Sequence, residues 1–522
     1  MLRLSDWFCG AGGSTQGLAA VPGVEALHAA NHWDRAVESH AANFPDVDHH
    51  CGDIRDLDVS RLPYAELFWA SPECPQWSQA NGKQRTYAIS DVELPGLERP
   101  RDVEAERSRA LMEEVPLYLE AMALRGRPVL AGVVENVVDV RKWIHWDAWV
   151  RRIQLAGYRT RLIALNSMHA QSIRTPRAPQ SRDRLYLAYW HISLRRDPDW
   201  DKWLRPTAWC PSCDQQINAV QAFKAPGRDM GRYRQQYVYR CPRISCRGQI
   251  VEPTFVPAAA AIDWTIPGQR IGDRSRPLAG KTIRRIEAGI RRYARPITLE
   301  AATAPKAVAV PPLLVPAGGT WNDTCTSLDE PMRTRTTRAT DGVFVPPLVM
   351  RNNSSSGDGA EMSTPASEEM RTITTAGHQS LVVPPFIAEL RGGGSDARAV
   401  TEALATVTAS GNHHALITMR QWAALYQYDT GLLRALDEVL PTQTTVSGDG
   451  LLQGVGLPAV EDCLFRMLEP HEIGAGMAFA VDYIVVGNRR ERTRQYGNAV
   501  TPPVAEIIGS ALIEAITGEP VT

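Results

Sequence analysis

Two residues of types that do chemistry in enzymes, a cysteine and a glutamate, each follow a short apolar run. Cys74 lies in Ser-Pro-Glu-Cys-Pro-Gln-Trp-Ser, residues 71–78, directly after the apolar residues 67–70. Glu135 directly follows the apolar run 129–134. Active sites of open α/β sheets lie at the carboxyl ends of the strands, so a nucleophilic thiol and an acid or base could meet there.

Two arginines could complete such a site. Arg182 and Arg184 lie in Gln-Ser-Arg-Asp-Arg, residues 180–184, before the apolar run 185–190. Guanidinium groups stabilise negative charge that develops during a reaction. Taken singly, these residues also fit ordinary structural roles, because a lone cysteine is usually a small buried hydrophobe and a lone glutamate a capping or surface residue.

A glycine-rich turn lies between the first apolar run and a predicted helix. Residues 8–13 read Phe-Cys-Gly-Ala-Gly-Gly, and glycines at a strand end let a ligand approach the backbone. A turn of this kind serves dinucleotides as well as other nucleoside cofactors. Asn-His-Trp-Asp at 31–34 follows a second predicted strand and Cys-Gly-Asp-Ile at 51–54 a third, so aromatic and acidic groups could converge on one adenosine.

Alternating strands and helices over residues 1–195 must position these groups. Helical stretches after Gly17 and near residues 104–124 separate the apolar runs, which predicts a parallel α/β sheet. After Pro206 the chain becomes arginine-rich with several cysteines, and residues 305–454 are rich in Pro, Gly, Thr and Ser. With 522 residues, two or more domains are expected.

Taken together and in this order, the motifs resemble those of the DNA (cytosine-5)-methyltransferase family. Residues 8–13 resemble its cofactor loop, residues 71–78 its nucleophile segment and residues 180–184 its Gln-x-Arg-x-Arg motif. Glu135-Asn136-Val137 is similar to its Glu-Asn-Val motif, and Gln-Tyr-Gly-Asn-Ala-Val at 495–500 to its final Gly-Asn-x-Val motif.

The resemblance implies a fold and a domain division. A Rossmann-like, S-adenosylmethionine-dependent methyltransferase sheet would occupy residues 1–195, completed by residues 490–522. A second, β-rich target-recognition region would occupy residues 196–489. Duplex DNA would be the partner, and the protein would act on it as a monomer.

The resemblance also implies a role for each site residue. Cys74 would be the thiolate that adds to carbon 6 of cytosine, and Glu135 would donate or share a proton at ring nitrogen 3. Arg184, with Arg182, would hold the base, which must be flipped out of the duplex to be reached. The S-adenosylmethionine site would comprise Phe8, Gly10, Gly12, Gly13, His32, Trp33, Asp53, Ile54, Pro72, Asn498 and Ala499.

Two residues depart from the family pattern. The nucleophile usually follows Pro-Pro, whereas Glu73 precedes Cys74, and a carboxylate facing the site would raise the thiol pKa. His32 stands where the family commonly has a glutamate that binds the ribose hydroxyls, although a neutral imidazole still hydrogen-bonds a hydroxyl. Two alternatives therefore stay open: a DNA-binding homologue with weak or no activity, and an enzyme of the same chemistry that acts on RNA.

Four further cysteines are spaced in two pairs. Cys210 and Cys213 form a Cys-x2-Cys pair, and Cys241 and Cys246 a Cys-x4-Cys pair. This spacing is typical of a zinc ribbon, so it predicts a structural zinc ion in an insert over residues 205–250, with unpaired loop cysteines as the alternative. The loop between the pairs is rich in arginine and could contact DNA phosphates.

A weak threonine-rich repeat runs through residues 310–450. Thr334, Thr372, Thr406 and Thr442 recur at spacings of 38, 34 and 36 residues, which favours a β-rich array. The repeats could form a scaffold without chemistry, or some of their turns could touch DNA phosphates.

Overall charge is uninformative, because the formal net charge is −1 and only local clusters can indicate a nucleic-acid partner. One such cluster, residues 270–295, holds nine Lys or Arg against two acidic residues. The start of the chain lacks a signal-peptide pattern, and no apolar run reaches the roughly 18 residues of a membrane helix, so we expect a cytoplasmic protein. A restriction–modification system, a solitary modification role and a viral protective role would all need the same enzyme.

Overall fold

The chain forms two compact units in a computed structural model. The structure describes residues 1–59, 61–72, 103–263, 265–266, 268–280, 282–284, 286 and 460–522, together with short strands between residues 313 and 453. The first unit comprises residues 1–263, 401–413 and 468–522, and the second comprises residues 264–400 and 414–467. The first unit therefore extends past residue 195, where we expected the catalytic domain to end, and it includes the cysteine-rich insert.

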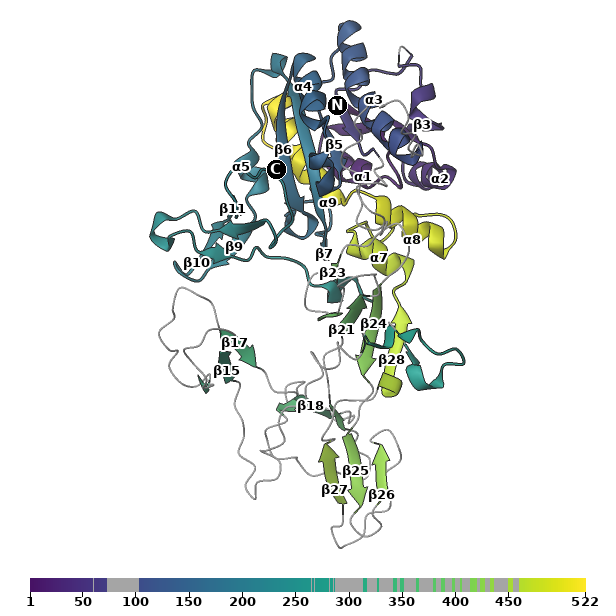
Figure 1. Cartoon of the computed structure of the whole chain (residues 1–522), viewed down its shortest axis with the longest axis vertical. Helices are drawn as coiled ribbons and strands as arrows, with labels where there is room; N and C mark the ends of the chain where they lie inside the picture. The colour runs from purple at the N-terminus through teal and green to yellow at the C-terminus, as the bar shows by residue number, and fades with distance from the viewer. Residues whose placement is uncertain are drawn as a thin grey trace, which may run out of the picture. The chain divides into compact units, whose positions relative to one another are not determined.

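A seven-stranded sheet forms the centre of the first unit, in the order β3-β2-β1-β4-β5-β8-β6. In the part of the sheet that has the order β3-β2-β1-β4-β5, neighbouring strands are parallel. Strand β8 runs antiparallel to both β5 and β6, so the sheet is mixed, whereas we expected a wholly parallel sheet. The strands, which Figure 1 shows in purple and blue, are β1 Leu2–Trp7, β2 Val24–Asn31, β3 Asp48–Cys51, β4 Leu67–Ala70, β5 Ala131–Asn136, β6 Tyr158–Asn166 and β8 Asp183–His191.

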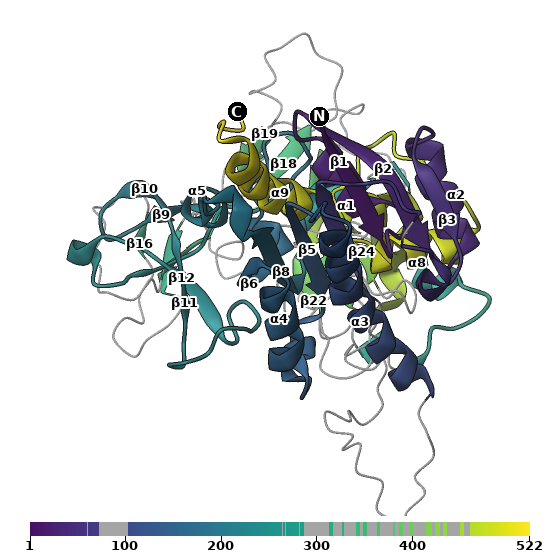
Figure 2. The same ribbon diagram turned by 90° about the horizontal axis from the view of Figure 1, so that it is seen from above.

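Both faces of the sheet are buried, which explains why its central strands are continuously apolar. All four residues of β4 are buried, and they alternate between two cores: Leu67 and Trp69 belong to one, Phe68 and Ala70 to the other. Helices α1 and α9 lie on one side of these strands and α3 and α4 on the other (Figure 2). The helices are α1 Gly13–Ala19, α2 Asp34–Asn43, α3 Val103–Leu124, α4 Trp146–Leu155, α5 Trp200–Leu204, α7 Pro470–Gly476, α8 Arg489–Asn498 and α9 Pro502–Thr517.

The last helix, α9, packs closely on α1. A Cβ at Gly17 would lie 2.2 Å from the carbonyl oxygen of Pro502, so only glycine permits this approach. Residues 489–517 have the length and composition of a membrane span, but 89% of their most apolar window lies buried inside the protein. The segment is therefore packed as a core helix.

The cysteine-rich insert consists of two small antiparallel sheets. One pairs β9 Thr207–Cys210 with β10 Gln215–Asn218, and the other has the order β11-β12-β13. These last strands are β11 Val220–Phe223, β12 Tyr237–Arg240 and β13 Ile250–Val251. The apolar side chains of the insert belong to the same core cluster as those of β5, α3 and α4, so the insert is a continuous part of the first unit.

The described parts of the second unit are strands, short turns and a few helical residues between 280 and 286. An antiparallel sheet has the order β14-β28-β24-β21-β22, and three further sheets have three strands each. Strands lie at the apolar segments that follow three of the threonine repeats, whereas the four repeat threonines are outside the described residues. The strands are β14 Gln269–Arg270, β15 Leu313–Pro316, β16 Thr326–Ser327, β17 Asp341–Phe344, β18 Leu348–Arg351, β19 Ser363–Pro365, β20 Gln379–Leu381, β21 Phe386–Glu389, β22 Ala397–Ala399, β24 His414–Met419, β25 Ala423–Gln427, β26 Leu432–Ala435, β27 Asp449–Gln453 and β28 Cys463–Met467.

Candidate active site

One edge of the sheet collects the predicted site residues. The parallel strands β1, β4 and β5 all end there, and the antiparallel strand β8 begins there, because Asn136 at the end of β5 pairs with Leu185 near the start of β8. A motif that precedes β8 therefore meets motifs that follow β1, β4 and β5. The reversed direction of one strand is what joins them.

The turn after β1 has a backbone that is shaped for a ligand. Phe8, Gly10 and Gly12 all have positive φ, of 58°, 55° and 93°, and Gly12 caps the N-terminus of α1. Around the position that a Cβ on Gly10 would occupy there is nothing within 4 Å, whereas a Cβ on Gly13 would lie 2.0 Å from the carbonyl oxygen of Val500. Gly10 thus borders open space where a ligand can approach, while Gly13 permits close packing of the C-terminal segment.

Buried hydrogen bonds of the strand β1 residue Asp6 stabilise this turn. The carboxylate of Asp6 accepts hydrogen bonds from the hydroxyls of Ser14 (2.6 Å) and Thr15 (2.7 Å). Burial raises the pKa of Asp6 to about 7, although these two hydroxyls lower it. From the C-terminal part of the chain, the hydroxyl of Tyr483 donates a hydrogen bond of 2.5 Å to the carbonyl oxygen of Ala11 in the turn. The sequence analysis did not single out these residues, although an acid within an apolar strand, followed by Ser-Thr, is a usable signal.

The predicted adenosine contacts lie after β2 and β3. Trp33 is half-buried, His32 is exposed, and Ile54 is buried. The guanidinium carbon of Arg494 lies 4.6 Å from the centre of the Trp33 ring, so a cation–π contact already covers part of this ring. Asp53 accepts a 2.6 Å hydrogen bond from Arg55.

Glu135 and Arg184 form an ion pair at the sheet edge. Arg184 Nε lies 3.1 Å from Glu135 Oε1, and the two side chains are only 16% and 10% exposed. Burial raises the pKa of Glu135, and the charges of Arg184 and Arg182 oppose this effect. A carboxyl group whose pKa is raised keeps its proton to a higher pH than a free glutamate does, which suits an acid catalyst.

Arg182 is placed differently from Arg184. Its guanidinium is buried and donates to the carbonyl oxygens of Gly497 (3.2 Å) and Ala499 (3.0 Å). Burial, together with the charge of Arg184, lowers the pKa of Arg182 to about 9. Arg182 therefore ties the final motif to the start of β8; within that motif Ala499 is buried and Asn498 is exposed.

The predicted nucleophile, Cys74, lies outside the described residues, which stop at Pro72 in this segment. Pro72 is buried, and its carbonyl oxygen accepts a hydrogen bond of 3.3 Å from the side chain of Asn136. Since Asn136 follows Glu135, this bond joins the segment that leads to Cys74 to the strand that carries Glu135. The sequence analysis named the Glu-Asn-Val motif but gave Asn136 no role.

The four paired cysteines come together in the insert. Their sulfur atoms all lie within 4.8 Å of one another, and the sulfurs of Cys210 and Cys246 are 3.8 Å apart. Four thiolates at about 2.3 Å from one tetrahedral zinc ion would be separated by about 3.8 Å. Burial raises the pKa of the Cys210 thiol, but hydrogen bonds from the backbone N–H groups of Cys213 and Ser212 oppose burial, and the pKa is lowered to about 7. The donor set fits a structural zinc ion.

Three of the arginines in the insert are engaged in contacts within the first unit. Arg232 pairs with Asp139, Arg234 pairs with Glu252, and Arg240 donates to the carbonyl of Gly248. Arg228, Arg234 and Arg243 are exposed and stay candidates for phosphate contact, and among the described residues Arg228 and Arg243 form no ion pair.

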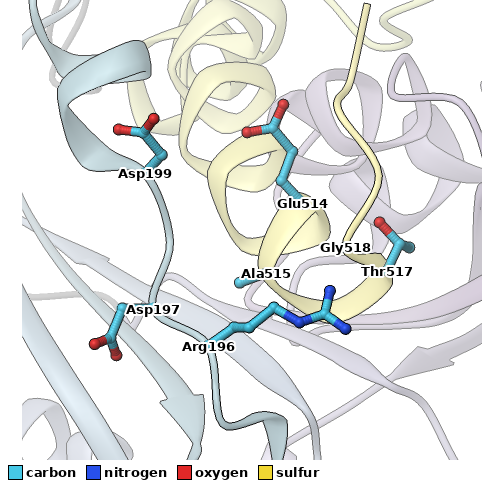
Figure 3. A pocket seen from close by; sticks show the side chains of 7 residues that line it. All are labelled: Arg196, Asp197, Asp199, Glu514, Ala515, Thr517 and Gly518. Carbon is cyan, nitrogen blue, oxygen red and sulfur yellow. The ribbon is translucent and has the colours of Figure 1, made fainter.

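A surface pocket lies elsewhere in the first unit (Figure 3). Two carboxylates of this pocket form structural hydrogen bonds. Asp197 accepts one from the indole N–H of Trp190 (2.9 Å), and Glu514 accepts one from the indole N–H of Trp203 (2.9 Å). It lies past the far end of β8, away from Glu135. Its lining residues are Arg196, Asp197, Asp199, Glu514, Ala515, Thr517 and Gly518. The pocket is separate from the candidate active site.

Comparison with known proteins gives one family match. Residues 2–92 match the family model described as C-5 cytosine-specific DNA methylase. No curated protein matches the chain.

Three solved structures are similar at low identity. A protein described as a DNA modification methyltransferase from an E. coli prophage is 12% identical, with a TM-score of 0.41, covering 99% of this chain and 100% of that one. A DNMT2 mutant from Spodoptera frugiperda is 12% identical, with a TM-score of 0.41 and coverage of 98% and 100%. The Entamoeba histolytica methyltransferase EhMeth is 9% identical, with a TM-score of 0.41 and coverage of 98% of both chains. The family assignment depends on residues 2–92.

Proposed function

We propose, from the match of residues 2–92 to the family model of C-5 cytosine-specific DNA methylases, that the protein transfers a methyl group from S-adenosylmethionine to carbon 5 of cytosine in duplex DNA. The family supports methyl transfer to cytosine as the activity. The observation that carries the finer proposal is the buried Glu135–Arg184 pair, which lies at the same sheet edge as the glycine turn.

The glycine turn fits S-adenosylmethionine, because Gly10 borders open space that a Cβ would partly fill. The cofactor would supply an electrophilic methyl group on a sulfonium. The backbone of Phe8 to Gly13 would hold its amino-acid part, and Trp33 and Ile54 would contact its adenine. Arg494 must then share the Trp33 ring with the adenine or move away from it.

Carbon 5 of cytosine is a weak nucleophile, and the proposed residues would make it more nucleophilic by addition of a thiolate to carbon 6. The thiolate of Cys74 adds to carbon 6, forming a carbon–sulfur bond, while Glu135 gives a proton to ring nitrogen 3 and Arg184 holds the base. Carbon 5 would then form a bond to the methyl group while the bond from that methyl group to the sulfonium sulfur breaks, leaving the cofactor as a neutral thioether. Loss of the carbon 5 proton to solvent water and cleavage of the bond between carbon 6 and the Cys74 sulfur would return Cys74 as a thiolate, and nitrogen 3 would return its proton to Glu135.

The test is methyl transfer from labelled S-adenosylmethionine to duplex DNA and to transfer RNA in parallel. We expect labelling of DNA, because the region between the catalytic motifs is large enough to hold a separate recognition domain. Labelling of RNA alone would refute the DNA proposal. A duplex that contains 5-fluorocytosine should be trapped covalently by the wild type, since fluorine at carbon 5 cannot leave as a proton does.

We also propose that Cys210, Cys213, Cys241 and Cys246 hold one structural zinc ion. The convergence of their sulfur atoms supports this proposal. Purified protein should contain close to one equivalent of zinc by mass spectrometry, and Cys241→Ser should lose it and melt at a lower temperature. A wild type without near-stoichiometric zinc would contradict the proposal.

A further inference from the structure

The loop between the two cysteine pairs lies against the two segments that carry Glu135 and Arg184. We propose that residues 232 and 233 of this loop are positioning residues for the catalytic pair: they fix the end of β5 and the start of β8 relative to each other. This inference rests on the proposed function, and it gives the insert a role in catalysis beyond the structural role expected from its cysteines.

The first contact is an ion pair. Arg232 Nη2 lies 2.7 Å from Oδ2 of Asp139, whose side chain is only 1% exposed. Asp139 belongs to the short 3₁₀ turn η3, Val138–Lys142, which begins three residues after Glu135. Although burial alone would raise the pKa of Asp139, Lys142 and Arg232 lower it, so the carboxylate stays charged and holds the loop firmly.

The second contact comes from the next residue. The backbone N–H of Tyr233 donates to Oδ1 of Asp183 at 2.9 Å. Asp183 is the first residue of β8 and directly precedes Arg184. Two consecutive loop residues therefore hold the segment that follows Glu135 and the residue that precedes Arg184, and the 3.1 Å separation of the catalytic pair depends on both segments.

The loop is itself anchored on the insert. The Tyr233 hydroxyl donates to Glu252 at 2.7 Å, and its ring packs edge-on against His169, with the ring centres 4.5 Å apart. Strand β12 follows the loop and leads directly into Cys241. The cysteine cluster and the catalytic pair are thus connected through one short segment, residues 232–241.

The decisive variant is Arg232→Ala. We expect single-turnover methyl transfer to fall about 10-fold to 100-fold, the scale of a small misplacement of catalytic groups, while the affinity for S-adenosylmethionine stays the same. Arg232→Lys keeps the charge and should recover part of the rate. Arg151→Ala, which removes an exposed arginine on α4, is the matched control and should react at the wild-type rate.

A second measurement does not depend on activity. Carbon-13 NMR of labelled glutamate, assigned with Glu135→Gln, gives the pKa of Glu135. Because Arg184 lowers this pKa, loosening the pair in Arg232→Ala should raise it, and Arg151→Ala should leave it unchanged. This readout still tests the inference if the wild type proves inactive, so failure of the proposed function and failure of the inference are distinguishable.

Destabilisation by the buried Asp139 charge is controlled by the double variant Arg232→Ala/Asp139→Asn, which removes that charge. The double variant also removes the ion pair between Lys142 and Asp139, but the Lys142 side chain is 57% exposed and can be solvated by water. A raised Glu135 pKa in both the single and the double variant supports positioning by Arg232. An unchanged Glu135 pKa in both would overturn the inference, as would a wild-type rate for Arg232→Ala.

Discussion

The two halves of the candidate site are held together by different forces: the proposed cofactor half, which is the glycine turn at residues 8–13, and the proposed base half, which contains Glu135 and Arg184. In the cofactor half, backbone conformations with positive φ shape the turn, and Asp6 binds Ser14 and Thr15, which lie only eight and nine residues along the chain. In the base half, charged side chains join distant segments: Glu135 meets Arg184, and Asp139 meets Arg232, which is 93 residues away.

This difference between local backbone contacts and long-range charge pairs predicts which substitutions should disrupt each half. The glycine turn is shaped mainly by local backbone geometry, with Tyr483 and the segment at Val500 as its distant contacts, so it should tolerate changes in the half that contains Glu135 and Arg184. Buried charge pairs depend on both partners, because removal of one leaves the other uncompensated. The base half should therefore be lost through changes that leave the cofactor half working.

The largest effect should come from Cys74→Ser. A hydroxyl is a far weaker nucleophile than a thiolate near neutral pH, so we expect methyl transfer to be abolished. Binding of S-adenosylmethionine, measured by calorimetry, should be close to that of the wild type. Substantial residual turnover would exclude Cys74 as the nucleophile.

Glu135→Gln should be the next most severe change. We expect the single-turnover rate to fall by roughly 100-fold, the usual scale for a positioned acid, with little change in cofactor affinity. Because burial raises the pKa of Glu135 and its protonated form is the donor, the wild-type rate should fall as pH rises through that pKa. A variant that keeps this limb of the pH profile would contradict the role.

Asp6→Asn should change the pH dependence of stability in the cofactor half. The folded-state pKa of Asp6 is raised to about 7, so between pH 4 and 7 the folded protein binds more protons than the unfolded chain. Its contribution to stability is therefore lost as pH rises through that window. Relative to the wild type, Asp6→Asn should gain on the order of 2 kcal/mol between pH 5 and pH 8.

Urea unfolding of both proteins at each pH measures this change. The comparison with wild type is needed because burial lowers the pKa of His40 to about 3, which makes the stability rise with pH in the acid range. Parallel stability profiles for the two proteins would show that Asp6 does not titrate as described.

The smallest effect should come from Gly10→Ala. Its positive φ makes alanine cost roughly 1 kcal/mol of stability, and the added methyl group occupies space proposed for the cofactor. Gly23→Ala is the matched control, since Gly23 also has positive φ and open surroundings but lies outside the site. We expect only Gly10→Ala to weaken S-adenosylmethionine binding, with Glu135 and Arg184 unaffected.

Several features of the site could be predicted because their signals are local. The glycine turn follows β1, Glu135 is the second-last residue of β5, and the Cys-x2-Cys and Cys-x4-Cys pairs converge, each as its own few residues indicate. The direction of β8 could not be predicted, because an apolar run has the same pattern in a parallel or an antiparallel strand. That direction decides that residues 182–184 meet Glu135.

The sequence by itself determined the types and the order of the reactive groups: a thiol, a carboxyl group, guanidinium groups and a glycine turn, in an order that resembles one enzyme family. Only the tertiary structure decided which arginine pairs with Glu135 and which supports the final motif, and that the insert contacts the catalytic edge through Arg232 and Tyr233. The physical reason is that a motif depends on residue types within a few positions. The partner of a buried charge is chosen by packing across the whole unit, and nothing near Asp139 in the sequence indicates Arg232.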